Sequence, residues 1–81
     1  MNIIDKFNEF CKLSVEEALQ KIEDLIEDYP RGFVGSNISI KDLETIQTDL
    51  LHAREELYYY DLDIEDKFKI VANSLRVIEK L

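Results

Sequence analysis

The chain has 81 residues, of which 18 are acidic and ten are basic, and its formal net charge is −8. This length is enough for one domain with a modest core, and the negative charge opposes direct binding to nucleic-acid phosphates or to anionic lipid. The only cysteine, Cys11, excludes an internal disulfide and a thiolate metal cluster within one copy. We therefore expect a single domain, 1–81.

Three further expectations concern where the chain works. Charged residues near the N-terminus exclude a signal peptide, and no apolar run approaches the length of a membrane span. A lone thiol fits a reducing compartment, so we expect a cytoplasmic protein without membrane insertion. A small domain without disulfides depends on good helix packing or on self-association, which leaves a homo-oligomer open.

Two helices are predicted in the first half of the chain. Apolar residues from Ile3 to Cys11 recur at helical spacing and indicate a short helix over 2–12. Ser14 and Glu17 have the spacing of a capping box, which predicts that a second helix begins at residue 15. Pro30 ends this second helix, which we expect over 15–29.

A loop, 30–38, is predicted next, because the two glycines and the one proline of the chain all lie there. Phe33 and Val34 within it have two interpretations: they pack against the end of a bundle, or they anchor a partner.

Two further helices are predicted after the loop, over 40–60 and 64–80. Ser39 and Asp63 are the expected N-caps. The last helix has an apolar stripe that we expect to be buried along its length: Ile64, Phe68, Val71, Leu75 and Ile78. The predicted fold is all-α, a small antiparallel helical bundle of about four helices, one short and three longer.

The acidic residues are unevenly distributed. Residues 12–29 carry a net charge of −4 and residues 40–63 a net charge of −5, whereas the last helix is close to +1. If the first two segments lie side by side they form an acidic face; otherwise they are the solvated sides of amphipathic helices.

Patterns that would indicate an enzyme are absent from the sequence. His52 is the only histidine, and no nucleophile motif surrounds the serines or Cys11. The acidic stretch from Asp61 to Asp66 is not an EF-hand, since the required glycine and the bidentate glutamate are replaced by Asp66 and Ala72. We expect no enzyme activity, no cofactor and no metal.

The stretch Glu55-Glu56-Leu57-Tyr58-Tyr59-Tyr60-Asp61 is the most informative for function. Successive helical residues are about 100° apart, so three adjacent tyrosines cannot all face one core. Tyrosine surrounded by carboxylates suits recognition of a basic protein. We expect Tyr59 and Tyr60 to anchor a partner while acids steer it: Glu55, Glu56, Asp61 and Asp63. The alternative is that Tyr58 belongs to the core and the other two tyrosines cover the bundle end.

The expected function is therefore that of a small acidic interaction protein that binds and restrains a basic or amphipathic protein partner. An immunity protein, an antitoxin, an antiholin-like protein or another phage-encoded antagonist fits this description. One alternative is a nucleic-acid mimic that inhibits a host DNA-binding protein, and another is a self-associating structural adaptor.

In size, acidity, helical content and its tyrosine cluster, the chain resembles nuclease-colicin immunity proteins. Those proteins carry a Tyr-Tyr pair after an acidic helix, and Leu57-Tyr58-Tyr59-Tyr60-Asp61 is the nearest stretch here. The proline that follows their tyrosines is absent. The chain also resembles small accessory proteins of large bacterial viruses. Both resemblances imply a helical binding protein.

Overall fold

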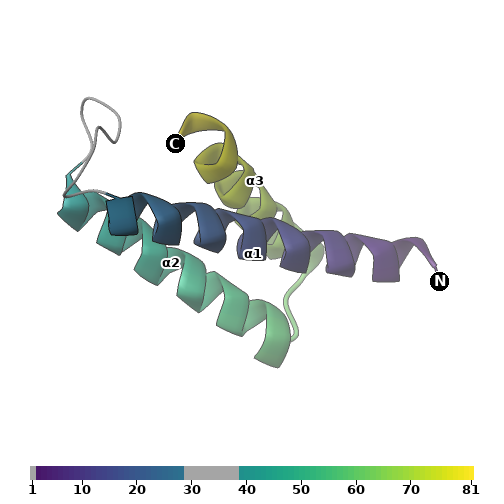
Figure 1. Ribbon diagram of the computed structural model, residues 1–81. Helices are drawn as coiled ribbons and strands as arrows, with labels where there is room; N and C mark the ends of the chain where they lie inside the picture. The colour runs from purple at the N-terminus through teal and green to yellow at the C-terminus, as the bar shows by residue number, and fades with distance from the viewer. Residues whose placement is uncertain (1, 29–38) are drawn as a thin grey trace.

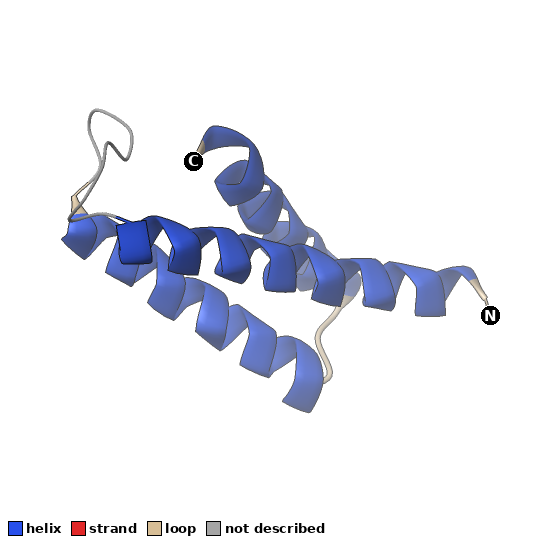
Figure 2. Cartoon of the chain, viewed as in Figure 1, coloured by secondary structure: helices blue, strands red, loops and turns tan. Residues whose placement is uncertain are grey.

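Three helices make up the computed structural model, which describes residues 2–28 and 39–81 (Figure 1). They are α1 (Ile3–Asp28), α2 (Ile40–Tyr59) and α3 (Ile64–Lys80). Figure 2 shows helices and short connections, and the described part of the chain contains no strand. The predicted all-α class is confirmed. The expected loop 30–38, with Phe33 and Val34, lies outside the described residues.

The first helix is continuous, so the break predicted between residues 12 and 15 is wrong. Ser14 lies inside α1 rather than in front of a new helix. Its hydroxyl donates a 2.8 Å hydrogen bond to the carbonyl of Phe10, one turn earlier, instead of accepting from a free backbone N–H. The apolar face also runs on through this point, because Cys11 and Val15 on either side of Ser14 are buried. The described residues thus form three helices rather than the expected four.

The start of α2 follows the predicted capping chemistry. The Ser39 hydroxyl accepts a 3.1 Å hydrogen bond from the N–H of Asp42, and the Asp42 carboxylate accepts from the N–H of Ser39. These reciprocal bonds satisfy two backbone donors that a helix N-terminus leaves without an intrahelical partner.

The start of α3 is capped in a similar way. Asp63 has an extended backbone and accepts a 2.9 Å hydrogen bond from the N–H of Asp66. The predicted N-caps Ser39 and Asp63 are therefore both confirmed, and they place the starts of the two helices where the sequence indicated.

Both shorter helices pack on α1 and contact each other little. Figure 1 shows α2 running back beside α1. The connection that follows α2 leads to α3, which crosses behind α1. Lys21 on α1 donates a 2.6 Å hydrogen bond to the carbonyl of Ile78 on α3. Arg54 on α2 lies 3.7 Å from Glu16 on α1, an exposed pair of small energetic weight. The arrangement is two helices against a central one, so the expected antiparallel bundle is not confirmed.

The core lies along the middle of α1. Its buried cluster combines four residues of α1 with two of α2 and one of α3: Val15, Ala18, Leu19, Ile22, Leu43, Leu50 and Val77. The two buried hydroxyls, Ser14 and Ser74, each donate to the carbonyl four residues earlier. No buried side-chain nitrogen or oxygen in the described residues lacks a partner.

The apolar stripe of α3 is buried only over its C-terminal part, which corrects the prediction for its beginning. Val71 and Val77 are buried, but Ile64 and Phe68 are 63% and 57% exposed. The member of the buried core cluster that comes from α3 is Val77, near the far end of the helix, whereas Phe68 contacts Phe7 near the start of α1.

Within residues 2–28 and 39–81, no helix combines the length and the apolar character needed to cross a membrane.

Candidate functional site

The tyrosine segment lies where α2 ends and the chain turns toward α3. Tyr58 and Tyr59 are in the last turn of α2, and Tyr60 is its C-cap, with an extended backbone and an N–H that donates to the carbonyl of Glu56 over 3.0 Å. Neighbouring residues of a helix are about 100° apart, and the helix ends at Tyr59, so the three tyrosines do not share one face. Their exposed fractions are 51%, 79% and 64% in chain order.

Tyr58 differs from the other two because its ring already has a partner. The Nζ of Lys12 on α1 lies 4.8 Å from the centre of the Tyr58 ring, a cation–π distance. This contact holds the end of α2 against α1. The alternative in which Tyr58 belongs to the core is wrong, since half of its surface is exposed. Tyr59 and Tyr60 remain as the rings with the largest accessible surface.

Three of the four predicted acidic residues line depressions beside Tyr60, and the fourth, Asp63, does not. Glu55, Asp61 and Asp63 are exposed, and Glu56 is partly buried. Asp63 caps α3, so its carboxylate is oriented by the N–H of Asp66. Glu55 and Glu56 are the carboxylates that share a shallow depression with Tyr60, of about 200 Å³, whose fourth lining residue is His52.

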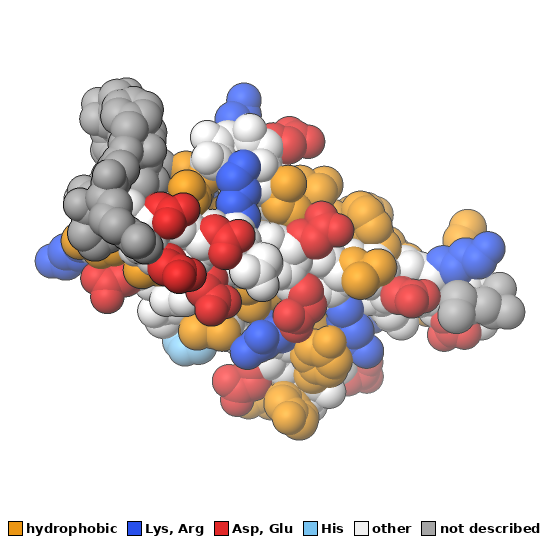
Figure 3. All heavy atoms as spheres, in the orientation of Figure 1, with side chains coloured by type: hydrophobic (Ala, Val, Ile, Leu, Met, Phe, Trp, Pro, Cys, Tyr) orange, Lys and Arg blue, Asp and Glu red, His pale blue; other side chains and the backbone are white. Residues whose placement is uncertain are grey.

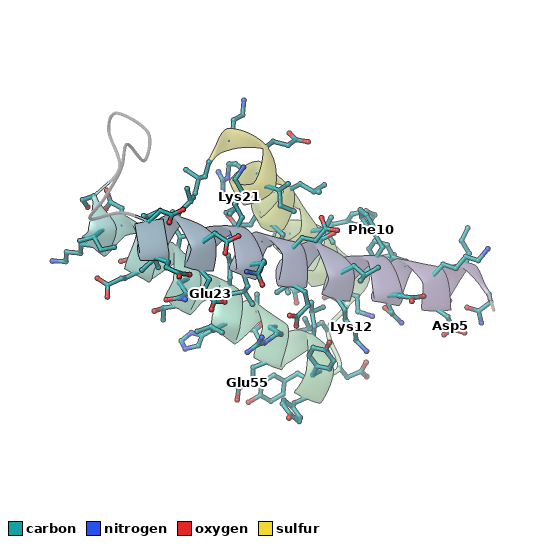
Figure 4. The ribbon with its side chains drawn as sticks, in the orientation of Figure 1. Asp5, Phe10, Lys12, Lys21, Glu23 and Glu55 are labelled. Carbon is teal, nitrogen blue, oxygen red and sulfur yellow. The ribbon has the colours of Figure 1, made fainter. Side chains whose placement is uncertain are left out.

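A second depression touches Tyr60 from the other side and has a different character. It is about 100 Å³ in volume and includes Asp61 together with two lysines, Lys12 of α1 and Lys67 of α3. Figure 4 shows Glu55 and Lys12 both near the C-terminal end of α2, from different helices. Tyr60 thus separates an acidic side from a mixed one. A cation approaching Tyr60 would meet two carboxylates without a lysine on the side of Glu55 and Glu56, and one carboxylate beside two lysines on the side of Asp61.

The acidic segments of α1 and α2 belong to two helices that pack against each other. Figure 3 shows acidic side chains gathered over the C-terminal half of α1, next to α2. An acidic face was expected only if the two segments lie side by side, and on this part of the molecule they do. Basic residues interrupt it: Arg54 lies against Glu16, and Lys21 bonds to α3.

The residue types considered above for nucleophilic catalysis and metal binding lie in different surroundings. His52 is exposed on α2. No group of three His, Cys, Asp or Glu residues within 2–28 and 39–81 could hold a metal ion. Cys11 is fully buried, and this burial raises the pKa of its thiol, which disfavours the reactive thiolate.

Two pockets formed between helices were not predicted from the sequence. One lies between α2 and α3, is about 280 Å³ in volume and includes Ile46, Arg76 and Leu81. The other, about 430 Å³, lies between the beginnings of α1 and α3. The dense apolar residues at the N-terminus were the available signal for the second, but their spacing was used only to predict a helix.

Comparisons of the chain with protein-family models, with curated proteins and with solved structures gave no match.

Proposed function

We propose that this chain is a small cytoplasmic interaction protein that binds and restrains a basic or amphipathic protein partner through the end of α2. The single observation that carries the proposal is that Tyr59 and Tyr60, adjacent in sequence, are 79% and 64% exposed at the end of a helix, where Tyr60 lines a depression with the carboxylates of Glu55 and Glu56. No catalytic step is part of the proposal. An immunity protein, an antitoxin, an antiholin-like protein or another phage-encoded antagonist would fit this proposal.

The chemistry of the surface supports a basic partner. Tyrosine supplies rigid contact area at a low cost in side-chain entropy, and exposed aromatic residues of this kind are common energetic centres of protein interfaces. The Glu55 and Glu56 side of Tyr60 would receive a lysine or arginine of the partner. The overall charge of −8 would accelerate the encounter with a positively charged protein.

Affinity capture from a bacterial lysate at low and at high salt tests the proposal, with captured proteins identified by mass spectrometry. The wild-type chain is compared with a Tyr59→Ala/Tyr60→Ala variant and a Glu55→Gln/Glu56→Gln variant. A Glu44→Gln/Asp49→Asn variant is the matched control, because it removes the same charge from the same helix at a distance from the tyrosines. A basic protein captured by the wild type and the control but lost from the other two supports the proposal. Equal capture by all four excludes this surface.

A nucleic-acid mimic remains the second candidate, because the acidic segments of α1 and α2 adjoin. The interruptions by Arg54 and Lys21 count against it, since a mimic needs evenly spaced negative charge. The same capture distinguishes the two: a mimic would retain a DNA-binding protein that free duplex DNA displaces, and loss of the two tyrosines would matter little.

A further inference from the structure

We infer that two copies of this chain associate through an apolar surface formed by the beginnings of α1 and α3. This N-terminal apolar surface is separate from the tyrosine segment and is defined by six residues: Ile3, Ile4, Phe7, Phe10, Ile64 and Phe68.

The surface is built around a ring pair and a groove. The rings of Phe7 and Phe68 lie 5.1 Å apart, inclined at 49°, and join α1 to α3. Beside them, a groove of about 430 Å³ is lined by Ile3, Ile4 and Ile64, with the hydrogen-bonded side chains of Asn8 and Lys67 at its edge. In Figure 4 Phe10 lies on the side of α1 that faces α3.

The exposure of these side chains is larger than isolated surface residues would explain. Ile3 is 82% exposed, Ile4 is 64% and Phe10 is 47%, in addition to the two exposed residues of α3. A whole large apolar side chain has a surface of about 150–250 Å². Multiplied by the exposed fractions of these five side chains, this leaves on the order of 500 Å² of apolar area in contact with water. A stable interface buries about 800 Å² on each partner. The surface therefore has the size of the apolar centre of such an interface.

Charge favours a second copy over other occupants. Within residues 2–12, Asp5 and Glu9 are balanced by Lys6 and Lys12, and at the start of α3 two acids are balanced by two lysines. Two molecules of charge −8 can meet here without bringing the acidic segments of α1 and α2 together. A basic partner would instead be drawn to those segments, and an anionic membrane would need a positive rim that is absent here.

The surface combines a protrusion with a groove, and a two-fold interface needs such a pair of matching features on each copy. The 26 residues of α1 span about 39 Å, close to the longest dimension of the molecule, 44 Å. Figure 1 shows the N-terminal end of α1 extending beyond α2 and α3. Each copy therefore offers a projecting apolar helix end and, beside it, a groove. In a two-fold dimer, the helix end of each copy would enter the groove of the other copy.

Burial of this surface would also offset the small size of the core. Nine apolar residues are buried in the described part of the chain. Domains of this size without disulfides or metals commonly gain the missing stability by association.

Sedimentation equilibrium of the full chain over a range of concentrations tests the inference. The wild type is expected to have twice the monomer mass of 9.6 kDa at high concentration. Ile3→Lys and Ile64→Lys are each expected to weaken dimerisation more than tenfold. Both positions are exposed, so circular dichroism should show unchanged helix content. Leu51→Lys, at an exposed apolar position on α2, is the matched control and should remain dimeric. So should the Tyr59→Ala/Tyr60→Ala variant, which separates this inference from the proposed function.

Three results would overturn the inference. The first is a wild type that stays monomeric at several hundred micromolar. The second is a dimer that Ile3→Lys and Ile64→Lys leave intact, and the third is a dimer that Leu51→Lys weakens equally. A parallel sedimentation with vesicles of anionic phospholipid separates the membrane alternative: a monomer that sediments with vesicles, and ceases to do so after Ile3→Lys, would replace the second copy by a lipid surface.

Discussion

The ammonium of Lys67 on α3 donates a 2.8 Å hydrogen bond to the side-chain carbonyl of Asn8 on α1, 59 positions earlier in the chain. Both residues are partly buried, and both line the apolar groove on one side and the small depression beside Tyr60 on the other. The pair therefore separates the two candidate binding surfaces and also attaches the start of α3 to α1.

Replacement of Asn8 by alanine is expected to lower the free energy of unfolding by about 1–2 kcal/mol, because a charged, partly buried donor loses its acceptor. Urea unfolding followed by circular dichroism measures this, with an unchanged dependence on urea. Gln20→Ala is the matched control, since the Gln20 amide bonds to Asp24 only on the exposed surface of one helix. Its effect should stay within about 0.5 kcal/mol. Equal losses in the two variants would show that the Asn8 amide does not hold α3.

Two serines should respond differently to alanine. Ser39 caps α2, and Ser39→Ala should cost about 1 kcal/mol of unfolding free energy because the hydroxyl that accepts from the N–H of Asp42 is lost. Ser14 lies inside α1 and bonds to the preceding turn, so Ser14→Ala should change stability by less than about 0.5 kcal/mol, as alanine is the better helix former. Thermal unfolding of both variants checks this contrast. A cost at Ser14 as large as at Ser39 would argue for a helix start at residue 15.

Neighbouring leucines on α2 test the position of the core. Leu50 is 1% exposed and belongs to the core cluster, whereas Leu51 is 39% exposed. Leu50→Ala should cost about 2–5 kcal/mol, enough to unfold much of a small domain. Leu51→Ala should cost less than about 1 kcal/mol. Chemical unfolding curves of the two variants provide the comparison, and a reversed order would mean that α2 is rotated about its axis.

The Cys11 thiol should be unreactive in the folded protein. Burial raises its pKa above the ordinary value of 9.0, an effect that the charge of Lys67 and a backbone hydrogen bond reduce in part. Alkylation by iodoacetamide at neutral pH should therefore be slow, and it should become fast in denaturant. Alkylation that is equally fast with and without denaturant would contradict the burial of this residue.

The same shift predicts how Cys11 contributes to stability as the pH changes. A pKa raised on folding means that the folded state keeps the proton when the unfolded state has lost it. The contribution is therefore complete below pH 9 and is lost as the pH rises through the pKa of the folded state. The measurement is the difference in unfolding free energy between the wild type and Cys11→Ala, in which the contributions common to both proteins cancel. This difference should shrink above pH 9; a constant difference would contradict the shift.

Local signals in the sequence predicted α2 and α3 well, because their starts depend on side chains next to the helix. Ser39 and Asp63 both accept from the backbone N–H three residues later. The same kind of signal failed at Ser14. A serine followed by a glutamate three positions on caps a helix only if the serine leaves the helical conformation, and here the uninterrupted apolar face keeps it inside α1.

The candidate surfaces were predicted unequally for a related reason. Exposure of the tyrosines followed from the 100° rotation between neighbours, a property of the helix itself. Exposure of Ile64 and Phe68 could not be predicted in that way. Their spacing shows which side of α3 is apolar, but how far a neighbouring helix extends over that side depends on where the helices cross.

Since α2 and α3 each pack on α1 and contact each other little, the molecule can open in two stages. Release of α3 breaks mainly its contacts with α1 and leaves the pair of α1 and α2, with its tyrosines, intact. Amide protons of α3 should then exchange with solvent through this partial opening, whereas those in the middle of α1, held on both sides, should exchange only when the whole chain unfolds. We therefore expect two classes of amide protection from exchange in a molecule with one core. The tyrosine segment that would bind a partner belongs to the better protected pair of helices.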